Sequence, residues 1–268
     1  MLRAKRHIIK LIPAIIIIFS ISTHVFAITN FAKPKQHIVK IEPPRKDFRV
    51  GELLSYKVRW MGIPVGEASL HVKEIVTING REAYHVIAKA GSNDFLDGFY
   101  KVEDEIHSYI DTEFFYTHRF EKHQREGRYK SDEVMDYDQV NHTARYESLL
   151  NGTVKTMEIP PRVQDVVSSF YCFRLEDMKP GDVVIMDVNA DEKNWKLPID
   201  VLEAVPLELR NRGVIDALKI EPKAKFKGLF VDRGRLLIYL SADKERVPLL
   251  IKIHTPWGLV GGELIDKK

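Results

Sequence analysis

Four carboxylates lie close together in the first half of the chain and form what we call the acidic cluster. They are Asp97, Glu103, Asp104 and Glu105. Hydrolysis of a glycosidic bond requires two carboxyl groups a fixed distance apart, so two members of the cluster could serve a polysaccharide hydrolase. Carboxylates on solvated strands are far commoner. The acidic cluster therefore makes polysaccharide hydrolysis an alternative function but does not assign it.

A run of basic residues offers a second chemistry, the binding of anions. Its members are Arg119, Lys122, His123, Arg125, Arg128 and Lys130, with Phe120 and Tyr129 between them. Arginine matches the geometry of phosphate and carboxylate groups, so the run could bind an anionic glycan or a lipid headgroup. Edge strands also carry such residues to avoid pairing with other chains. Both interpretations remain open at this point.

Other polar residues favour structural roles. Asp165 lies in the expected first turn of a helix, where a carboxylate caps free amides. Arg174, near the end of the same helix, either pairs with a sheet carboxylate such as Asp243 or binds an anionic ligand. Cys172 lies in an apolar run and reads as a small buried side chain.

Several reaction classes lack their residues in this sequence. The histidines His107, His118, His123 and His142 show no strong ligand spacing, so no metal site is expected. There is neither a Gly-x-Ser-x-Gly elbow nor a phosphate-binding loop. We expect no cofactor and no catalytic residues.

The N-terminus predicts export. Four basic residues precede an apolar run from Leu11 to Ile21, and Val25-Phe26-Ala27 resembles a cleavage site. We expect residues 1–27 to be a signal peptide that is cleaved after Ala27, because the run is shorter than the ~20 residues that span a bilayer. The mature protein would then reach the periplasm with no integral membrane span.

Cleavage changes the charge of the chain. Four of its 41 basic residues lie in residues 1–27, which leaves 37 basic and 38 acidic residues, a net charge of −1 rather than +3. Nothing in this balance indicates nucleic acid as a partner. With one cysteine there is no internal disulfide, so the protein must be held together by its core.

The remaining elements are mostly strands. Residues 28–48 read as an extended lead-in, and residues 50–72 alternate apolar and polar positions on both sides of a Gly- and Pro-containing turn, which predicts a hairpin. Asn79-Gly80 and Asn151-Gly152 predict two more hairpins. A polar hairpin is expected over residues 118–137, and an aromatic loop around Phe95 and Phe99 is expected to cover one end of the sheet.

One helix interrupts the strands. Residues 161–178 place apolar residues at helical spacing and are followed by Lys179-Pro180-Gly181. About a dozen strands and one helix predict an all-β fold for residues 49–268 as a single domain. We expect a single curved, mostly antiparallel sheet that forms an open or partly closed β-barrel, with the helix covering its concave side.

Five segments, in this order, resemble the exported bacterial envelope proteins of domain of unknown function 3108 (DUF3108). They are GELLSYKVRWMGIPVGEASL, FYKVEDEIHSYID, HRFEKHQREGRY with the following Asp136-Tyr137-Asp138, IPPRVQDVVSSFYCFR and LLIYLSADKERVPLLIKIHTPWG. The resemblance covers most of residues 50–264. It implies an exported protein with a curved open β-barrel and no assigned catalysis.

These observations favour a periplasmic, non-enzymatic binding or scaffold protein of the cell envelope. Its concave sheet would offer an apolar cavity to a lipid, glycolipid or polysaccharide. The residues expected to line or floor this cavity are Leu54, Val58, Trp60, Leu70 and Phe170. Arg174, Arg119, Arg125 and Arg128 are the candidate anion-binding residues. The alternatives are a hydrolase that acts through the acidic cluster and a protein adaptor that uses the polar hairpin.

Overall fold

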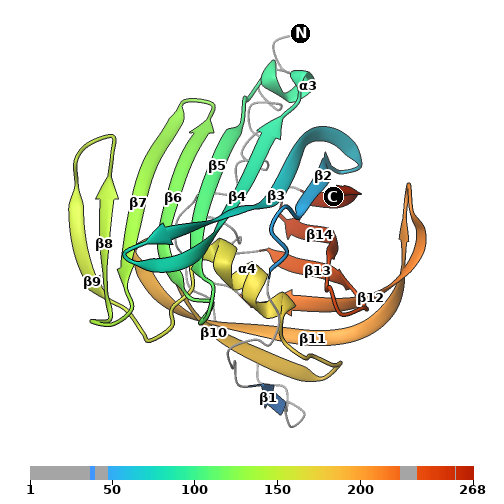
Figure 1. Ribbon diagram of the computed structural model, residues 1–268. Helices are drawn as coiled ribbons and strands as arrows, with labels where there is room; N and C mark the ends of the chain where they lie inside the picture. Colours follow the sequence, from blue (N-terminus) through green and yellow to red (C-terminus); the bar gives the residue numbers. More distant parts are fainter. Residues whose placement is uncertain (1–36, 40–47, 224–233, 257) are drawn as a thin grey trace.

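The computed structural model describes residues 37–39, 48–223, 234–256 and 258–268, and they form one long sheet with two helices (Figure 1). The predicted signal peptide and most of the predicted lead-in lie outside these residues. The strands are β1 (His37–Val39), β2 (Leu53–Trp60), β3 (Ile63–Ile78), β4 (Arg81–Ser92), β5 (Glu103–Asp111), β6 (Thr117–Glu126), β7 (Tyr129–Asp138), β8 (Thr143–Ser148), β9 (Val154–Glu158), β10 (Asp182–Ala190), β11 (Lys193–Leu209), β12 (Gly213–Pro222), β13 (Arg235–Ser241), β14 (Pro248–Thr255) and β15 (Gly258–Lys267). The helices are α3 (Asp94–Asp97) and α4 (Val166–Arg174).

The sheet consists of two antiparallel meanders that meet where the last strand pairs with β2. Its order is β1-β10-β11-β12-β13-β14-β15-β2-β3-β4-β5-β6-β7-β8-β9, and β1 alone pairs in parallel, with β10. The all-β, mostly antiparallel prediction is confirmed. The barrel is supported only in part, because the sheet curves strongly but does not close: among the described residues, β9 pairs only with β8.

The expected hairpins form where the turn dipeptides predict them. Asn79 and Gly80 both have positive φ, 51° and 80°, between β3 and β4. This is the pattern of the tight turn that matches strand twist, and glycine adopts it without strain. Gly127 and Gly152 take the same region between β6 and β7 and between β8 and β9. These turns fix the register of each pair.

Two segments show features that the sequence patterns do not indicate. Strand β11 runs from Lys193 to Leu209 without interruption and carries Pro206. Proline has no backbone N–H to donate to a neighbouring strand. Pro206 is tolerated because β10 pairs with β11 only as far as Asp200, so the edge of β11 beyond Asp200 has no strand partner on that side. The aromatic loop contains the short helix α3, and its rings Phe95 and Phe99 are exposed rather than packed on the sheet.

Helix α4 lies across the concave face of the sheet, as predicted (Figure 1). Asp165 is its N-cap: one carboxylate oxygen accepts the amides of Val167 at 2.6 Å and Ser168 at 2.9 Å. The other oxygen accepts the hydroxyls of Ser108 and Thr117, at 2.6 and 2.8 Å, from the sheet below. The cap thus starts the helix and ties it to β5 and β6.

The main core lies between α4 and the concave face of the sheet. Tyr171, Phe173 and Cys172 enter it from the helix, and Phe48 packs its ring against Tyr171 from the end of the lead-in. Cys172 is buried, with its Sγ 3.0 Å from the carbonyl oxygen of Phe115, as expected for a structural thiol. No helix within the described residues is long and apolar enough to cross a bilayer.

Candidate functional site

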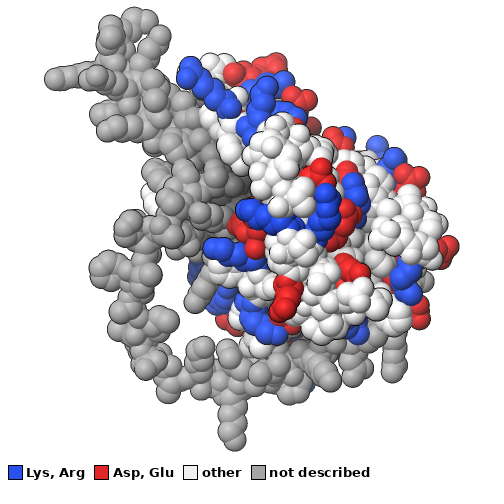
Figure 2. Space-filling view, turned by 90° about the vertical axis from the view of Figure 1, so that its left-hand side faces the viewer, with Lys and Arg blue, Asp and Glu red and all other residues white. Residues whose placement is uncertain are grey.

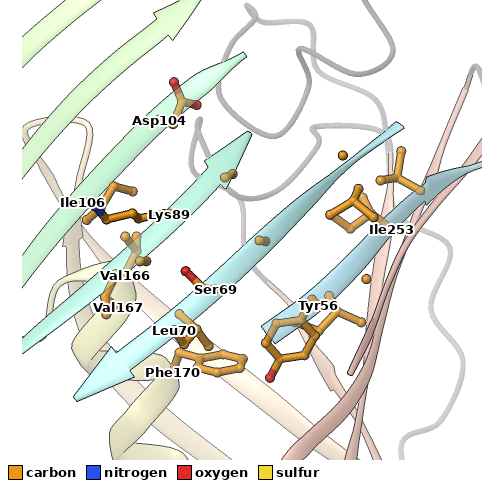
Figure 3. A pocket seen from close by; sticks show the side chains of 18 of the residues that line it. Tyr56, Ser69, Leu70, Lys89, Asp104, Ile106, Val166, Val167, Phe170 and Ile253 are labelled. Atoms are coloured by element: carbon orange, nitrogen blue, oxygen red, sulfur yellow. The ribbon is translucent and has the colours of Figure 1, made fainter. Parts of the chain in front are cut away.

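A cavity of about 250 Å³ opens on the concave side of the sheet, next to α4 (Figure 3). Its wall is almost wholly apolar. One side comes from β2 to β5, the second from α4, and the third from β11 to β15. The cavity is therefore assembled by strands from both meanders, and the β15–β2 pairing that joins them runs through its wall.

Helix α4 supplies the bulky part of this wall. Val166, Val167, Phe170 and Phe173 line it, and the ring of Phe170 lies beside Leu70 and Tyr56 in Figure 3. The helix turns this face to the cavity because its cap and its buried Tyr171 hold the opposite side against the sheet. The helical period thus places one apolar stripe toward open space.

Small residues on β3, β4 and β15 leave the space open. Ala68, Ala88, Ala90 and Gly262 line the cavity where larger side chains would fill it. Gly66 is required for a different reason, because a Cβ there would lie 2.2 Å from the carbonyl oxygen of Gly91 on β4. The two strands therefore approach closely at the upper end of the cavity, next to its polar residues.

Two acidic residues close the polar end of the cavity, and we call them the carboxyl pair. Asp104 on β5 is 4% exposed and Glu126 on β6 is 2% exposed. Both line the cavity, and their side chains lie within hydrogen-bonding reach of each other. Figure 3 shows Asp104 at one end of the lining, away from Phe170 and Val167 at the other.

The surroundings keep a proton on the carboxyl pair. Burial, followed by the negative charge of Asp104, raises the pKa of Glu126 from 4.5 to about 8. Burial also raises the pKa of Asp104, although the backbone amide of Arg125 donates to its Oδ1 at 2.9 Å. Two carboxylates in contact cannot both ionise cheaply, so near neutral pH the pair holds one proton and about one negative charge.

The structure places the expected lining residues unevenly. Val58, Leu70 and Phe170 line the cavity. Leu54 does not, because it is fully buried in a second core cluster with Tyr56 and Leu264. Trp60 is also outside the lining, at the far end of β2 beside the turn to Ile63. Alternation along β2 identifies its inward face but not how far the cavity extends along it.

The candidate anion-binding arginines lie away from the cavity. Arg174 is buried and makes a two-pronged ion pair with Glu52 at 2.8 and 3.0 Å, not with Asp243. Arg119 is paired with Glu121 and Asp136. Arg125 contacts Asp132 at 2.9 Å, and Arg128 is exposed at the β6–β7 turn. None of these four arginines lines the cavity.

Of the acidic cluster, only Asp104 faces the cavity. Glu103 and Glu105 flank it on β5, so they point to the outer face, where Lys101 and Lys89 pair with them. The second carboxyl of the site, Glu126, was missed because it lies in the polar hairpin. The signal was present in the alternation Lys122, Gln124, Glu126, which puts a polar row on the inner face of β6.

Fold and site together define a class: an all-β protein whose open, curved sheet holds an apolar cavity beneath one helix. Within that class the chain belongs to the family described as "Protein of unknown function (DUF3108)", which matches residues 55–264. The family resemblance seen in the sequence is confirmed. No curated protein matches the chain.

Two solved structures are similar to the chain. One is a beta-barrel-like protein of domain of unknown function DUF1849 from Brucella abortus, with TM-score 0.53 and 6% identity over 82% of this chain and 97% of that one. The other is a putative exported protein with a YmcC-like fold from Bacteroides fragilis, with TM-score 0.36 and 7% identity over 84% of this chain and 99% of that one. The first supports the barrel-like fold alone.

Proposed function

We propose that the chain is an exported, non-enzymatic binding protein of the bacterial envelope that holds the apolar part of a lipid or glycolipid in its concave cavity. The observation that carries the proposal is the cavity itself, which is apolar along most of its wall and open on the concave side. Ligand pockets have this character, with a few polar groups that fix orientation.

The way in which the cavity is kept open supports binding over a packing defect. Protein interiors are close-packed, and voids larger than a water molecule are few. Here Ala88 and Ala90 face the cavity from β4, at positions where the same inward row elsewhere carries Tyr84 and Val86 in the core. The strand thus changes from large to small side chains where the cavity begins.

The same geometry argues against the hydrolase. Glycosidases hold their two carboxyl groups about 5 Å apart or more, to leave room for the sugar or a water. Asp104 and Glu126 are in hydrogen-bonding contact with each other, and the remaining members of the acidic cluster face outward. The adaptor proposal gains no comparable support, since Arg119 and Arg125 of the polar hairpin already hold carboxylates of their own strands.

A fluorescent apolar probe tests the proposal. N-phenylnaphthylamine should bind the mature protein and brighten. Ala88→Trp fills the cavity and should weaken this binding by about tenfold or more, a loss of roughly 1.4 kcal/mol. Glu82→Trp is the matched control, because it adds the same ring at an exposed position of the same strand, next to the β3–β4 turn and outside the cavity lining, and should leave binding unchanged.

Two results would contradict the proposal. One is a wild-type protein that does not brighten the probe. The other is an Ala88→Trp variant that folds, by circular dichroism and thermal unfolding, and binds the probe as tightly as the wild type. In either case the apolar space would be a feature of packing rather than a binding site.

A further inference from the structure

The carboxyl pair is unusual for the end of an apolar cavity, because its oxygens outnumber their donors. Asp104 Oδ2 and Glu126 Oε2 are buried, and no described residue outside the pair donates a hydrogen bond to either oxygen. The other two oxygens receive the Arg125 amide at 2.9 Å and the Gln124 side-chain amide at a long 3.4 Å. Buried polar atoms nearly always have partners, so these two need an explanation.

Within the part of the chain that the structure describes, no cationic side chain is paired with the carboxyl pair. Lys122 lies near both carboxyl groups, but its ammonium group is 2.9 Å from Glu133, which balances its charge. Lys89 lines the cavity with its stem and pairs with Glu105 at 3.0 Å on the outer face. Among the described residues, no salt bridge reaches Asp104 or Glu126. The described residues of the site therefore offer negative charge and hydrogen-bond acceptors without a cation that pairs with them.

We propose that Asp104 and Glu126 bind the polar end of the cavity's ligand, and that this end is an ammonium group. This inference rests on the proposed function, since the apolar part of the same molecule would occupy the cavity between β4 and α4. The ligand is therefore an amphiphile with a cationic, hydrogen-bond-donating end. An ammonium group donates up to three hydrogen bonds, which matches the two carboxyl oxygens that receive none from outside the pair.

The electrostatics of the pair favour the same chemistry. Without a ligand, the pair lowers its charge by keeping a proton on Glu126. An ammonium group placed between the two carboxyls would take over that role and stabilise both in the ionised form. A carboxylate or phosphate would instead face a negative charge in a site shielded from water, where repulsion is strong. The pair thus selects the ligand by its charge, and the apolar wall selects it by its chain.

Three probes with the same alkyl chain and different end groups test this inference: decylamine, decanol and decanoate. Each is used to displace N-phenylnaphthylamine from the mature protein at neutral pH, at a probe concentration below the micellar limit. We expect the wild type to bind decylamine at least about tenfold more tightly than decanoate, with decanol between them. Asp104→Asn/Glu126→Gln keeps the size of both side chains and removes their charge. In this variant the preference should fall to within about threefold, while decanol still binds.

The outcomes separate this inference from the function on which it rests. If none of the three probes displaces N-phenylnaphthylamine, the proposed binding function fails. If all three bind the wild type equally, or the double variant keeps the preference for decylamine, the cavity binds alkyl chains but the carboxyl pair does not distinguish their end groups. The single variants Asp104→Asn and Glu126→Gln repeat the comparison if the double variant does not fold, and Glu103→Gln, on the outer face, is the control.

Discussion

Replacing Glu126 by glutamine should stabilise the protein by an amount that grows with pH. The pKa of Glu126 is raised from 4.5 to about 8, because burial and the neighbouring Asp104 favour its neutral form. A raised pKa means that the folded state binds the proton more tightly than the unfolded state. The resulting stability is fully present below about pH 4.5 and is lost progressively as the pH rises to about 8.

The size of the effect follows from the same shift. One pKa unit corresponds to about 1.4 kcal/mol, so the rise from 4.5 to about 8 corresponds to roughly 5 kcal/mol of folding free energy once Glu126 is fully ionised. Glutamine has almost the shape of the protonated acid and never ionises. Glu126→Gln should therefore match the wild type at low pH and exceed it near pH 8 by a few kcal/mol, roughly half to all of that value. Loss of the Glu126 charge also lets Asp104 ionise more easily, which acts in the same direction.

Urea unfolding of both proteins between about pH 5 and pH 8 measures this difference. The groups near Glu126 are Asp104 and Lys122, and both are retained in the variant, so the difference reports the titration of the carboxyl pair. Glu103→Gln is the control, because Glu103 is exposed and paired with Lys101, and it should show no such trend. A difference between Glu126→Gln and wild type that stays constant across this range would refute the argument for a buried, proton-holding pair.

Three further changes test other parts of the structure. Arg174→Met leaves the buried carboxylate of Glu52 without its cation and should lower the free energy of unfolding by about 3 to 5 kcal/mol. The double variant Arg174→Met/Glu52→Gln should recover most of this loss. Equal losses in the single and the double variant would contradict the prediction. Asp165→Ala removes the N-cap and leaves two buried hydroxyl groups without their acceptor. Calorimetry should therefore show a loss of about 2 to 4 kcal/mol in the free energy of unfolding. A loss below ~0.5 kcal/mol would contradict the prediction. The rings of Phe95 and Phe99 are 59% and 56% exposed beside the cavity wall. The double variant Phe95→Ser/Phe99→Ser should take up N-phenylnaphthylamine from vesicles several-fold more slowly, with unchanged stability. An unchanged uptake rate would show that these rings have no role in loading the cavity.

The local elements of this fold could be predicted from sequence because each depends on neighbouring residues. Asn79-Gly80 fixes a tight turn through its own backbone angles, and the residues after Asp165 show their helical face by spacing alone. The pairing of β15 with β2 could not be predicted in this way, because it joins residues about 200 apart. That pairing nevertheless determines how the two meanders meet and so where the cavity lies.

The candidate site was predictable only in part for a related reason. Phe170 and Leu70 could be assigned to the cavity because both lie on apolar faces of regular elements. The carboxyl pair depends on the register of β5 against β6, which places Asp104 opposite Gln124 and diagonally across from Glu126. Alternation shows that both acids face inward, but not that they meet. The ion-pair partner of Arg174 could not be predicted either, because Glu52 lies 122 residues away in the sequence.

Native mass spectrometry of the protein, isolated without detergent from the cells that produce it naturally, tests most directly whether the cavity is a binding site. We expect a discrete additional mass of a few hundred daltons, on the order of what a pocket of this size encloses. That mass should be lost in Ala88→Trp, retained in Glu82→Trp, and identified on release as an amphiphile with a cationic end. Wild-type protein that carries only the mass of its own chain, under conditions in which a bound decylamine standard survives, would contradict the claim that this cavity is a binding site.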